Sequence, residues 1–194
     1  MFDWPLPARL VSVSAFGYAV GCLNAGYYLV RARHRTDLRD VHSGNAGATN
    51  AGRVLGRRGF VGVLCLDAAK GACAASIGVW LAGDLGGAVG ALSAIVGHIW
   101  PVQLHFRGGK GIATACGAFL VLEPVTLMSV VAVALTLLAL TRRWSASGLI
   151  AVALSPLVAL VLRRPNMSMA TIVLAVAVVL AAHRDDLSAL RSSP

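Results

Sequence analysis

Charged and aromatic residues are scarce in this chain. Of its 194 residues, 13% are charged and 6% are aromatic, whereas 57% are hydrophobic. A soluble protein of this size needs more polar residues than that to cover its surface. The composition therefore excludes an ordinary soluble domain and predicts an integral membrane protein, whose apolar side chains are solvated by lipid.

Acidic residues and cysteines are also few. The charge balance limits the kinds of binding partner, and the cysteine pattern bears on metals and cofactors. Only 8 Asp and Glu residues oppose 17 Lys and Arg residues, which gives a net charge of +9. Because aromatics are rare and the arginines adjoin apolar runs, we expect anionic lipids and phosphorylated small molecules as partners, and no nucleic acid. The cysteines form no CxxC pair and no Cys/His cluster with metal-ligand spacing, so we expect them to pack, with no metal and no cofactor. They are Cys22, Cys65, Cys73 and Cys116.

Long apolar runs make up most of the remaining chain. A helix of about 20 residues crosses the hydrocarbon core of a bilayer, and shorter helices are tolerated where their ends are buried among other helices. Glu123-Pro124 divides one long run, because proline removes a backbone donor and disfavours helix in the residue before it. We therefore expect an all-α bundle of seven transmembrane helices, or six if that run is unbroken. The expected spans are Leu10 to Val30, Phe60 to Ala82, Gly86 to Val102, Ile112 to Leu122, Val125 to Leu140, Leu149 to Leu162 and Met167 to Ala182.

The basic residues between these spans predict the orientation. With seven spans, Arg9, Arg163 and Arg164 fall on one side and thirteen other Lys and Arg residues on the other. Since cytoplasmic loops carry the excess of positive charge, we expect the N-terminus outside and the C-terminus in the cytoplasm. We treat residues 1–194 as one membrane-embedded domain. The thirteen cytoplasmic residues are Arg31, Arg33, Arg35, Arg39, Arg53, Arg57, Arg58, Arg107, Lys110, Arg142, Arg143, Arg184 and Arg191.

Two glycine-rich polar segments interrupt the apolar pattern. The first cassette, residues 42–50, reads HSGNAGATN, and the second cassette, residues 106–111, reads FRGGKG. The expected topology puts both on the cytoplasmic face, together with Arg142-Arg143 and His183-Arg184. Backbone N–H groups beside cations bind anionic oxygen clusters, so we expect one phosphate-binding site here. A simpler interpretation is that ordinary cytoplasmic loops use glycine to make turns.

The residue types in the cassettes suit a phosphate. Gly44 and Gly47 permit close approach of a ligand, and Arg53 adds a fixed cation. Thr114 lies on the first turn of the next expected helix, whose positive dipole end faces the same place. A glycine follows Lys110, where a Walker A loop has Ser or Thr, so we do not expect an NTPase. The other expected ligands are the side chains of Ser43, Asn45, Thr49 and Asn50 and the backbone of Gly108, Gly109 and Gly111.

Two opposite charges, Asp67 and Lys70, lie inside the second expected span. An isolated charge at mid-membrane costs about 2.5 to 3.5 kcal/mol on insertion scales. Residues three apart share one helix face. We expect the two to pair, with direct contact to substrate as the alternative.

Several stretches resemble the bacterial acyl-phosphate:glycerol-3-phosphate acyltransferases, the PlsY family. The longest are SGNAGATNAGR at 43–53, GHIWPV at 97–102 and GGKGIAT at 108–114. The resemblance implies a seven-helix enzyme of the bacterial cell membrane with its site facing the cytoplasm. It also implies transfer of an acyl group from acyl phosphate to glycerol 3-phosphate, which gives lysophosphatidic acid. Shorter matches in the same order are Asp67 with Lys70-Gly71, Thr141-Arg142 with Ser145, and His183-Arg184.

The resemblance and the chemistry together suggest roles in the site. Lys110 and Arg53 would bind phosphate with the glycine backbone, and the polar side chains of the first cassette would donate hydrogen bonds, as would Ser145. His183 would position or deprotonate the glycerol hydroxyl, unless the leaving phosphate serves as the base. Ser145 could instead only cap a helix, and His98 is either a site residue or a buried structural histidine.

The third family motif is altered in this chain. The family has Asn three residues after the histidine and then Arg, where this chain has Asp186 and Ala189. A carboxylate at Asp186 would repel a phosphate unless a cation offsets it. A catalytically impaired paralogue that binds lipid or phosphate is therefore the first alternative, and an anion transporter is the second, although we find no inverted repeat. No histidine is followed five positions later by Asp, so we expect acyl phosphate as the donor and not acyl-CoA.

Overall fold

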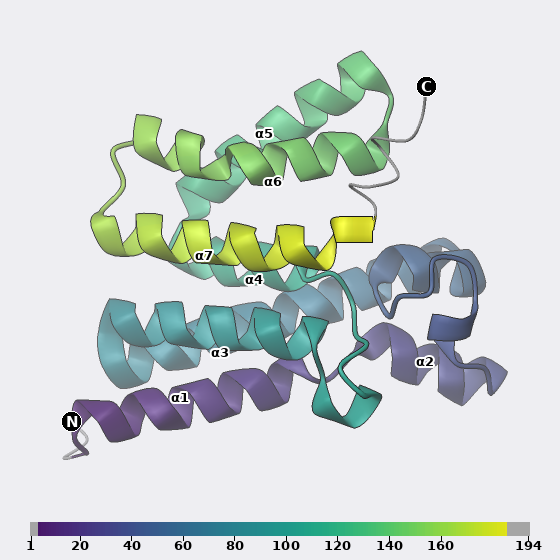
Figure 1. The fold of residues 1–194 in the computed structure, drawn as a ribbon, viewed down its shortest axis with the longest axis horizontal. Coiled ribbons are helices and arrows are strands. Elements are labelled where there is room, and N and C mark those ends of the chain that lie inside the picture. Colours follow the sequence, from purple (N-terminus) through teal and green to yellow (C-terminus); the bar gives the residue numbers. More distant parts are fainter. Residues whose placement is uncertain (1–3, 186–194) are drawn as a thin grey trace.

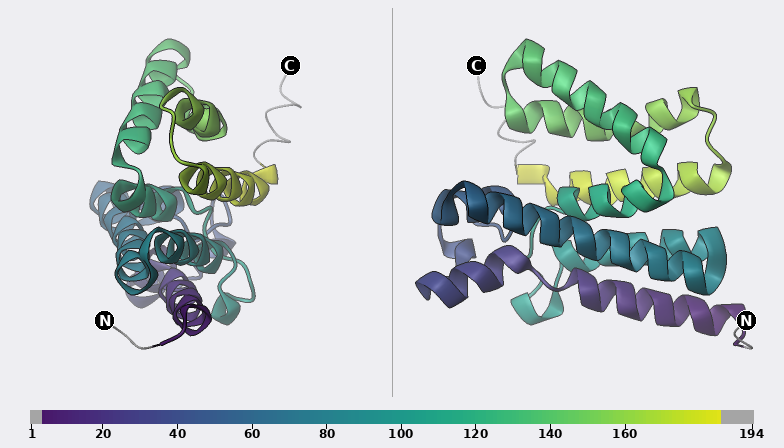
Figure 2. Two further views of the ribbon diagram at one scale, coloured as in Figure 1. Left: turned by 90° about the vertical axis from the view of Figure 1, so that its left-hand side faces the viewer. Right: turned by 180° about the vertical axis from the view of Figure 1, so that it is seen from behind.

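The structure, a computed structural model, describes residues 4–185, and the regular secondary structure of this part of the chain is all helical (Figure 1). The elements are stacked in layers, with α1 on one side, α3 next, then α4 with α7, and α5 with α6 on the other side (Figure 2). Asp186 and Ala189 lie outside the described residues, so the expectations for them stay predictions. The elements are α1 (Leu6–Gly21), α2 (Ala25–His34), η1 (Leu38–Asp40), α3 (Ala48–Ile99), η2 (Val102–Leu104), α4 (Ile112–Leu122), α5 (Pro124–Thr141), α6 (Trp144–Val161) and α7 (Asn166–Ala182).

The expected first span, Leu10 to Val30, is wrong in that it is not continuous: α1 ends and α2 begins after a short break. The break leaves the carbonyls of Cys22 and Leu23 outside the regular helix; Asn24 donates locally to Cys22 O, and side chains from distant parts of the chain donate to both carbonyls. Gln103 Nε2 lies 2.6 Å from Cys22 O, and Lys70 Nζ lies 2.8 Å from Leu23 O. Because these donors come from other parts of the chain, the apolar pattern of the first span could not predict the break.

Helix α3 is interrupted at two glycines. Gly56 (φ 72°) and Gly83 (φ 62°) adopt left-handed backbone conformations, which glycine takes without a Cβ clash. The segments 57–81 and 84–99 then lie side by side and run in opposite directions (Figure 1). They match the second and third expected spans to within one helical turn.

The break expected at Glu123-Pro124 is confirmed, since α4 ends and α5 begins there. Glu123 is buried in this turn, where its Oε2 pairs with Arg164 Nε and accepts a hydrogen bond from Thr126 Oγ1 at 3.2 Å. Arg164 lies in the turn between α6 and α7. The ion pair therefore joins the two turns at the end of the molecule opposite the glycine cassettes (Figure 1).

Helix α6 begins at Trp144, before the expected start at Leu149. The intervening residues 145–148 are small and two of them are serines, so hydropathy alone assigned them to a loop. Ser147 is buried, and its Oγ lies 3.0 Å from Thr141 Oγ1 at the end of α5. This contact closes the α5–α6 turn and allows the helix to start early.

Small residues bring α1, α3 and α4 into close contact. A Cβ added to Gly21 or Gly97 would overlap a backbone carbonyl across the α1–α3 interface, and one added to Gly71 or Gly117 would do so across the α3–α4 interface. Such small residues are typical of helix contacts in membranes. In α5, by contrast, the buried residue is Thr126 alone. The bundle thus has a tightly packed centre, and α5 lies at its edge.

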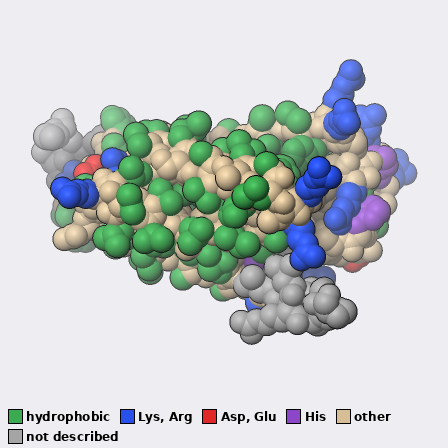
Figure 3. Space-filling view, turned by 90° about the horizontal axis from the view of Figure 1, so that it is seen from above, with side chains coloured by type: hydrophobic (Ala, Val, Ile, Leu, Met, Phe, Trp, Pro, Cys, Tyr) green, Lys and Arg blue, Asp and Glu red, His purple; other side chains and the backbone are tan. Residues whose placement is uncertain are grey.

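Charged side chains gather at the two ends of the molecule, and the band between them is mostly apolar (Figure 3). Both cassettes, the α5–α6 turn and the C-terminal end of α7 lie at the same end (Figure 1), as the sequence predicted. In the described residues, four helical stretches are long and apolar enough to cross a membrane. They are Leu6–His34, Ala48–Leu104, Pro124–Thr141 and Trp144–Val161, and the shorter apolar helices are Ile112–Leu122 and Asn166–Ala182.

Replacing Gly117 with Ala should push α4 away from α3, because the added Cβ would overlap the Ala68 carbonyl. Overpacking of this kind costs about 1 to 3 kcal/mol. We expect G117A to lose its monodisperse peak at a lower temperature than the wild type in detergent size-exclusion chromatography. Gly62→Ala is the control, since nothing lies within 4 Å of its added Cβ. Equal melting of G117A and G62A would contradict the close packing.

Candidate active site

The two glycine cassettes lie against each other. The Ala46 N–H donates to Gly108 O at 3.2 Å, which joins the first cassette directly to the second. Arg39 adds a second link, because its Nη1 donates to Leu104 O at 2.7 Å. The Arg39 guanidinium also pairs with Asp37 at 2.6 Å and holds the pKa of that carboxyl below its usual range. The segments around both cassettes therefore form one loop assembly.

Asn50 holds the first cassette in shape. Its side chain is fully buried, and its Nδ2 lies 2.8 to 3.1 Å from the carbonyl oxygens of Leu38, Val41 and Asn45. Its Oδ1 accepts the Ser43 N–H at 3.3 Å. The amide that we expected to contact substrate is thus used within the loop, and a direct contact would require these bonds to break.

The second cassette is fastened to the end of α3. The Gly108 N–H donates to Ile99 O and the Gly109 N–H donates to His98 O, both at 3.0 Å. Both amides therefore already have acceptors in the protein, and their binding to phosphate stays a prediction. Gly111 differs: with φ at 85° it is the N-cap of α4, and the first N–H groups of a helix have no acceptor within the helix.

Polar side chains face outward around this assembly. Ser43, Thr49 and Arg53 are exposed, and Lys110 is partly exposed. Lys and Arg residues crowd this end of the molecule (Figure 3). The surface therefore offers hydroxyl groups and cations to an anionic ligand.

Two local features shape the backbone of the first cassette. Gly44, with φ at 68°, turns the chain, and the Asn45 Oδ1 accepts the Gly47 N–H at 2.7 Å.

His183 caps the C-terminal end of α7, where it is buried. Its Nδ1 lies 2.8 Å from Val179 O. Because a carbonyl only accepts, Nδ1 carries the proton, and in the neutral ring the lone pair is on Nε2. The ring is therefore in the tautomer that can take a proton at Nε2.

Two expected ligands lie less favourably. Thr114 is completely buried on the first turn of α4, and its Oγ1 has no hydrogen-bond partner among residues 4–185. Ser145 is exposed near the start of α6. The α5–α6 turn is at the same end as the cassettes but separated from them by α7 (Figure 1). The structure therefore does not bring Ser145 next to the cassettes.

A buried polar cluster lies beneath the second cassette. Asp67 and Lys70 pair as expected, with Lys70 Nζ 2.9 Å from Asp67 Oδ1. The same Nζ lies 2.7 Å from His98 Nδ1. All three side chains are buried. The pairing predicted from sequence is confirmed, and His98 joins it as a third member.

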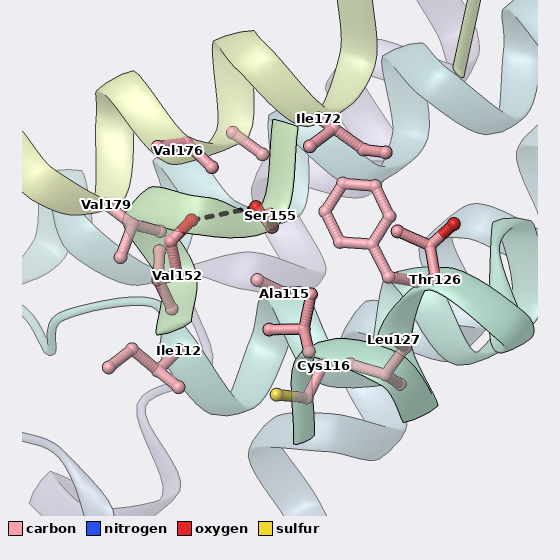
Figure 4. A pocket seen from close by; sticks show the side chains of 13 residues that line it. Ile112, Ala115, Cys116, Thr126, Leu127, Val152, Ser155, Ile172, Val176 and Val179 are labelled. Atoms are coloured by element: carbon pink, nitrogen blue, oxygen red, sulfur yellow. Dashed lines mark hydrogen bonds between the residues drawn. The ribbon is translucent and has the colours of Figure 1, made fainter. Parts of the chain in front are cut away.

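An apolar cleft begins beside the second cassette and runs between α4, α5, α6 and α7 (Figure 4). It encloses about 550 Å³ of empty space, part of which is open to the outside. Ile112, the first residue of α4, lines it near the cassettes, and Val179 lines it one turn from His183. Phe119 lines both this cleft and a second, more polar pocket that contains Glu123. The polar end of the molecule is thus continuous with a space suited to an aliphatic chain.

Sequence reasoning missed two residues that shape this region, Gln103 and Arg39. Each donates to a backbone carbonyl in a distant segment, of Cys22 and Leu104 respectively. Neither stands in a motif that carries chemistry. Their roles can be predicted only once the helix breaks are known, because the backbone carbonyls at the breaks are the groups that need donors.

Comparison with known proteins gives a consistent result. The model of the family "Glycerol-3-phosphate acyltransferase" matches residues 11–193. The chain is 42% identical over 171 residues to glycerol-3-phosphate acyltransferase 1 of Desulfitobacterium hafniense, covering 88% of this chain and 85% of the relative. It is 40% identical over 186 residues to glycerol-3-phosphate acyltransferase of Geobacter sulfurreducens, covering 92% of each.

Solved structures agree. The crystal structure of PlsY, an integral membrane glycerol 3-phosphate acyltransferase, in its glycerol 3-phosphate form superposes with a TM-score of 0.88. That chain is 30% identical, and the match covers 94% of this chain and 92% of that one. The lysophosphatidic acid form gives a TM-score of 0.85 at 28% identity.

Replacing Asn50 with Asp should loosen the first cassette even without substrate. An aspartate keeps the acceptor for Ser43 but cannot donate to the three loop carbonyls, and each buried group left unpaired costs about 1 to 3 kcal/mol. We expect N50D to have a lower melting temperature in detergent. Asn45→Asp is the matched control, because Asn45 uses its oxygen as the acceptor and Asp retains it. If N50D melts like N45D, Asn50 is not what holds the loop.

Proposed function

Because the chain belongs to the glycerol-3-phosphate acyltransferase family, we infer that it is a membrane enzyme that acylates glycerol 3-phosphate and produces lysophosphatidic acid. One observation in this chain supports the inference most directly. The two cassettes, joined by the bond from Ala46 to Gly108, open beside the apolar cleft. A charged end next to an aliphatic slot suits one phosphorylated substrate and one with an acyl chain.

We propose that the chain crosses the membrane seven times as one domain, 1–194. Helix α1, the segments 57–81 and 84–99 of α3, and α4 to α7 would each make one crossing. The positive-inside rule places the basic end, with both cassettes, in the cytoplasm and the N-terminus outside. The chain is a multi-pass integral membrane protein, and the bacterial cell membrane is the proposed location.

We propose acyl phosphate as the donor, with its acyl chain in the cleft that starts at Ile112. Lys110 and Arg53 would hold the two phosphates by charge-assisted hydrogen bonds, aided by Ser43 and Thr49 and by the first-turn amides of α4 after Gly111. Gly44 would let ligand and backbone approach closely, whereas Gly108 and Gly109 would let the second cassette pack against the end of α3. Asn45, Asn50 and Thr114 would act from behind this surface, by holding the loops and the start of α4.

The reaction requires no covalent enzyme intermediate. The glycerol hydroxyl oxygen attacks the acyl carbonyl carbon, a new ester C–O bond forms, and the bond from carbonyl carbon to phosphate oxygen breaks. Phosphate is a good leaving group, so the enzyme chiefly aligns the substrates and stabilises charge on the carbonyl oxygen. The hydroxyl proton goes to His183 Nε2 or to the leaving phosphate. If His183 is the acceptor, its bond to Val179 O makes Nε2 the ring nitrogen that takes the proton.

Purified protein should form lysophosphatidic acid from palmitoyl phosphate and glycerol 3-phosphate, and none from palmitoyl-CoA. The reason is that the cleft and cassettes offer a slot and a phosphate site, whereas none of the histidines has the spacing typical of acyl-CoA-dependent enzymes. Product is measured by mass spectrometry with protein in detergent. Turnover with palmitoyl-CoA alone would reject the proposed donor, and turnover with neither would favour an impaired paralogue.

Arg53→Ala and Lys110→Ala test the proposed phosphate site in the same assay. Each removes a charge-assisted hydrogen bond worth about 1.5 to 3 kcal/mol, so kcat/KM should fall about ten-fold to a hundred-fold or more. Arg58, an exposed arginine on the same helix, is the matched control, and R58A should keep wild-type kinetics. Wild-type values for R53A or K110A would remove that residue from the site.

The proposed orientation predicts which introduced cysteines an impermeant thiol reagent can reach. The native cysteines at 22, 65, 73 and 116 are first replaced by Ala or Ser. Ser43→Cys should then be protected in intact cells and labelled in inverted vesicles. Asp84→Cys, in the exposed turn at the opposite end, should show the reverse. Labelling of Ser43→Cys from outside intact cells would overturn the orientation.

A further inference from the structure

We propose that His98 is a positioning residue for the second cassette, and that Lys70 and Asp67 fix its ring. The inference rests on the proposed function, since it assigns these buried groups a role in setting where Lys110 meets phosphate. His98 would act on the reaction through the position of the loop and not by touching the reacting atoms.

Three contacts determine the position of the Lys70 ammonium. Its Nζ lies 2.9 Å from Asp67 Oδ1, 2.7 Å from His98 Nδ1 and 2.8 Å from Leu23 O. An ammonium has N–H donors and no acceptor, so Lys70 donates to Leu23 O and to His98 Nδ1, while its charge pairs with the Asp67 carboxylate. Lys70 thus joins the second span, the end of α3 and the break after α1 at one point.

The bond from Lys70 also sets the state of the histidine ring. Because Lys70 only donates, His98 Nδ1 accepts, and the proton of the neutral ring is on Nε2. A second proton would have to go on Nδ1, where Lys70 already donates at 2.7 Å, and Asp67 Oδ1, 3.6 Å from that nitrogen, is already paired with the ammonium at 2.9 Å. The ring is therefore held neutral, in one tautomer and in one orientation.

The other edge of this ring supports the second cassette. A Cβ added to Gly109 would overlap His98 Nε2, so Gly109 lies directly on the ring. The Gly109 N–H also donates to His98 O at 3.0 Å. Ring and carbonyl together fix the height of Gly109 above α3, and Lys110 is the next residue. Displacement of reacting groups by about 1 Å can lower a rate about a hundred-fold.

A purely structural role for the Asp67–Lys70 pair predicts something different. If the pair only neutralises two charges inside the membrane, a neutral pair of similar size should serve as well, as often holds for buried ion pairs. If Lys70 orients His98, the neutral pair should fold but leave the ring and the loop above it poorly fixed. The double variant D67N/K70M separates the two roles.

The first test is a double-mutant cycle between positions 98 and 109. Gly109→Ala should lower kcat/KM for glycerol 3-phosphate about ten-fold or more, because the methyl group displaces the loop. His98→Asn keeps an acceptor for Lys70 but removes the ring edge beneath Gly109, so it should also impair turnover. In the H98N background G109A should cost much less, because the space is now free. Equal costs of G109A in both backgrounds would overturn the direct contact.

A second readout does not depend on activity. Hydrogen–deuterium exchange of the peptide 106–111 should be faster in H98N, G109A and D67N/K70M than in the wild type. Gly78→Ala is the control for general damage, since its Cβ would overlap Gly86 O beside the Gly83 turn of α3, away from the second cassette. G78A should melt at a lower temperature yet keep wild-type KM and slow exchange at 106–111.

The outcomes distinguish this inference from the proposed function. Wild-type exchange and kinetics in D67N/K70M would overturn the role of Lys70, and wild-type values in H98N would overturn that of His98. If the wild-type protein turns over no acyl donor but the exchange differences appear, the proposed function fails while the positioning of the loop stands.

Discussion

Backbone groups inside a bilayer must find partners within the protein, because hydrocarbon offers none, and this chain interrupts its helices repeatedly. Three of the interruptions within the described residues have a side-chain donor from a distant part of the chain. Lys70 and Gln103 donate to the carbonyls after α1, Arg9 donates to Leu81 O at 3.1 Å before the Gly83 turn, and the Tyr18 hydroxyl donates to Trp100 O at 2.9 Å after α3. The donors at Cys22, Leu23 and Trp100 make irregular backbone tolerable near the cassettes, so the geometry of the site depends on them.

The bundle has two differently packed parts: helices α1, α3 and α4 pack closely through glycines, whereas α5 lies beside an apolar cleft. The centre of α1, α3 and α4 is held by backbone approaching backbone, at Gly21 and Gly117 for example, which leaves little room to deform. Helix α5 has Thr126 as its one buried residue, and the cleft opens on the side of α5 that carries Thr126, Leu127 and Val130. The tightly packed centre of α1, α3 and α4 thus supports the polar loops, and it lies next to the cleft beside α5, which an acyl chain from the membrane could enter.

Much of the fold could be predicted from hydropathy and from helix-breaking residues. The length of an apolar run and a proline such as Pro124 both act on the local backbone. The break at Cys22 could not be predicted, since its cause is a pair of donors far away in sequence. For the site, the position of the cassettes at one end followed from charge asymmetry. Which individual groups are available to a ligand did not follow from the sequence. The amides of Gly108 and Gly109 and the side chain of Asn50 already make hydrogen bonds within the protein. The sequence shows which groups can form hydrogen bonds but not which already have partners. The Asp67–Lys70 pair was predictable from spacing, whereas His98 needed the fold.

The bond from Ala46 to Gly108 means that the two cassettes cannot be ordered independently. A ligand that stiffens one cassette lowers the entropy that the other has left to lose. Occupancy of either half therefore changes the affinity of the other, and thermodynamic reciprocity requires the same factor in both directions. Two substrates that share no side chain would then be coupled through the backbone contact between the loops that hold them.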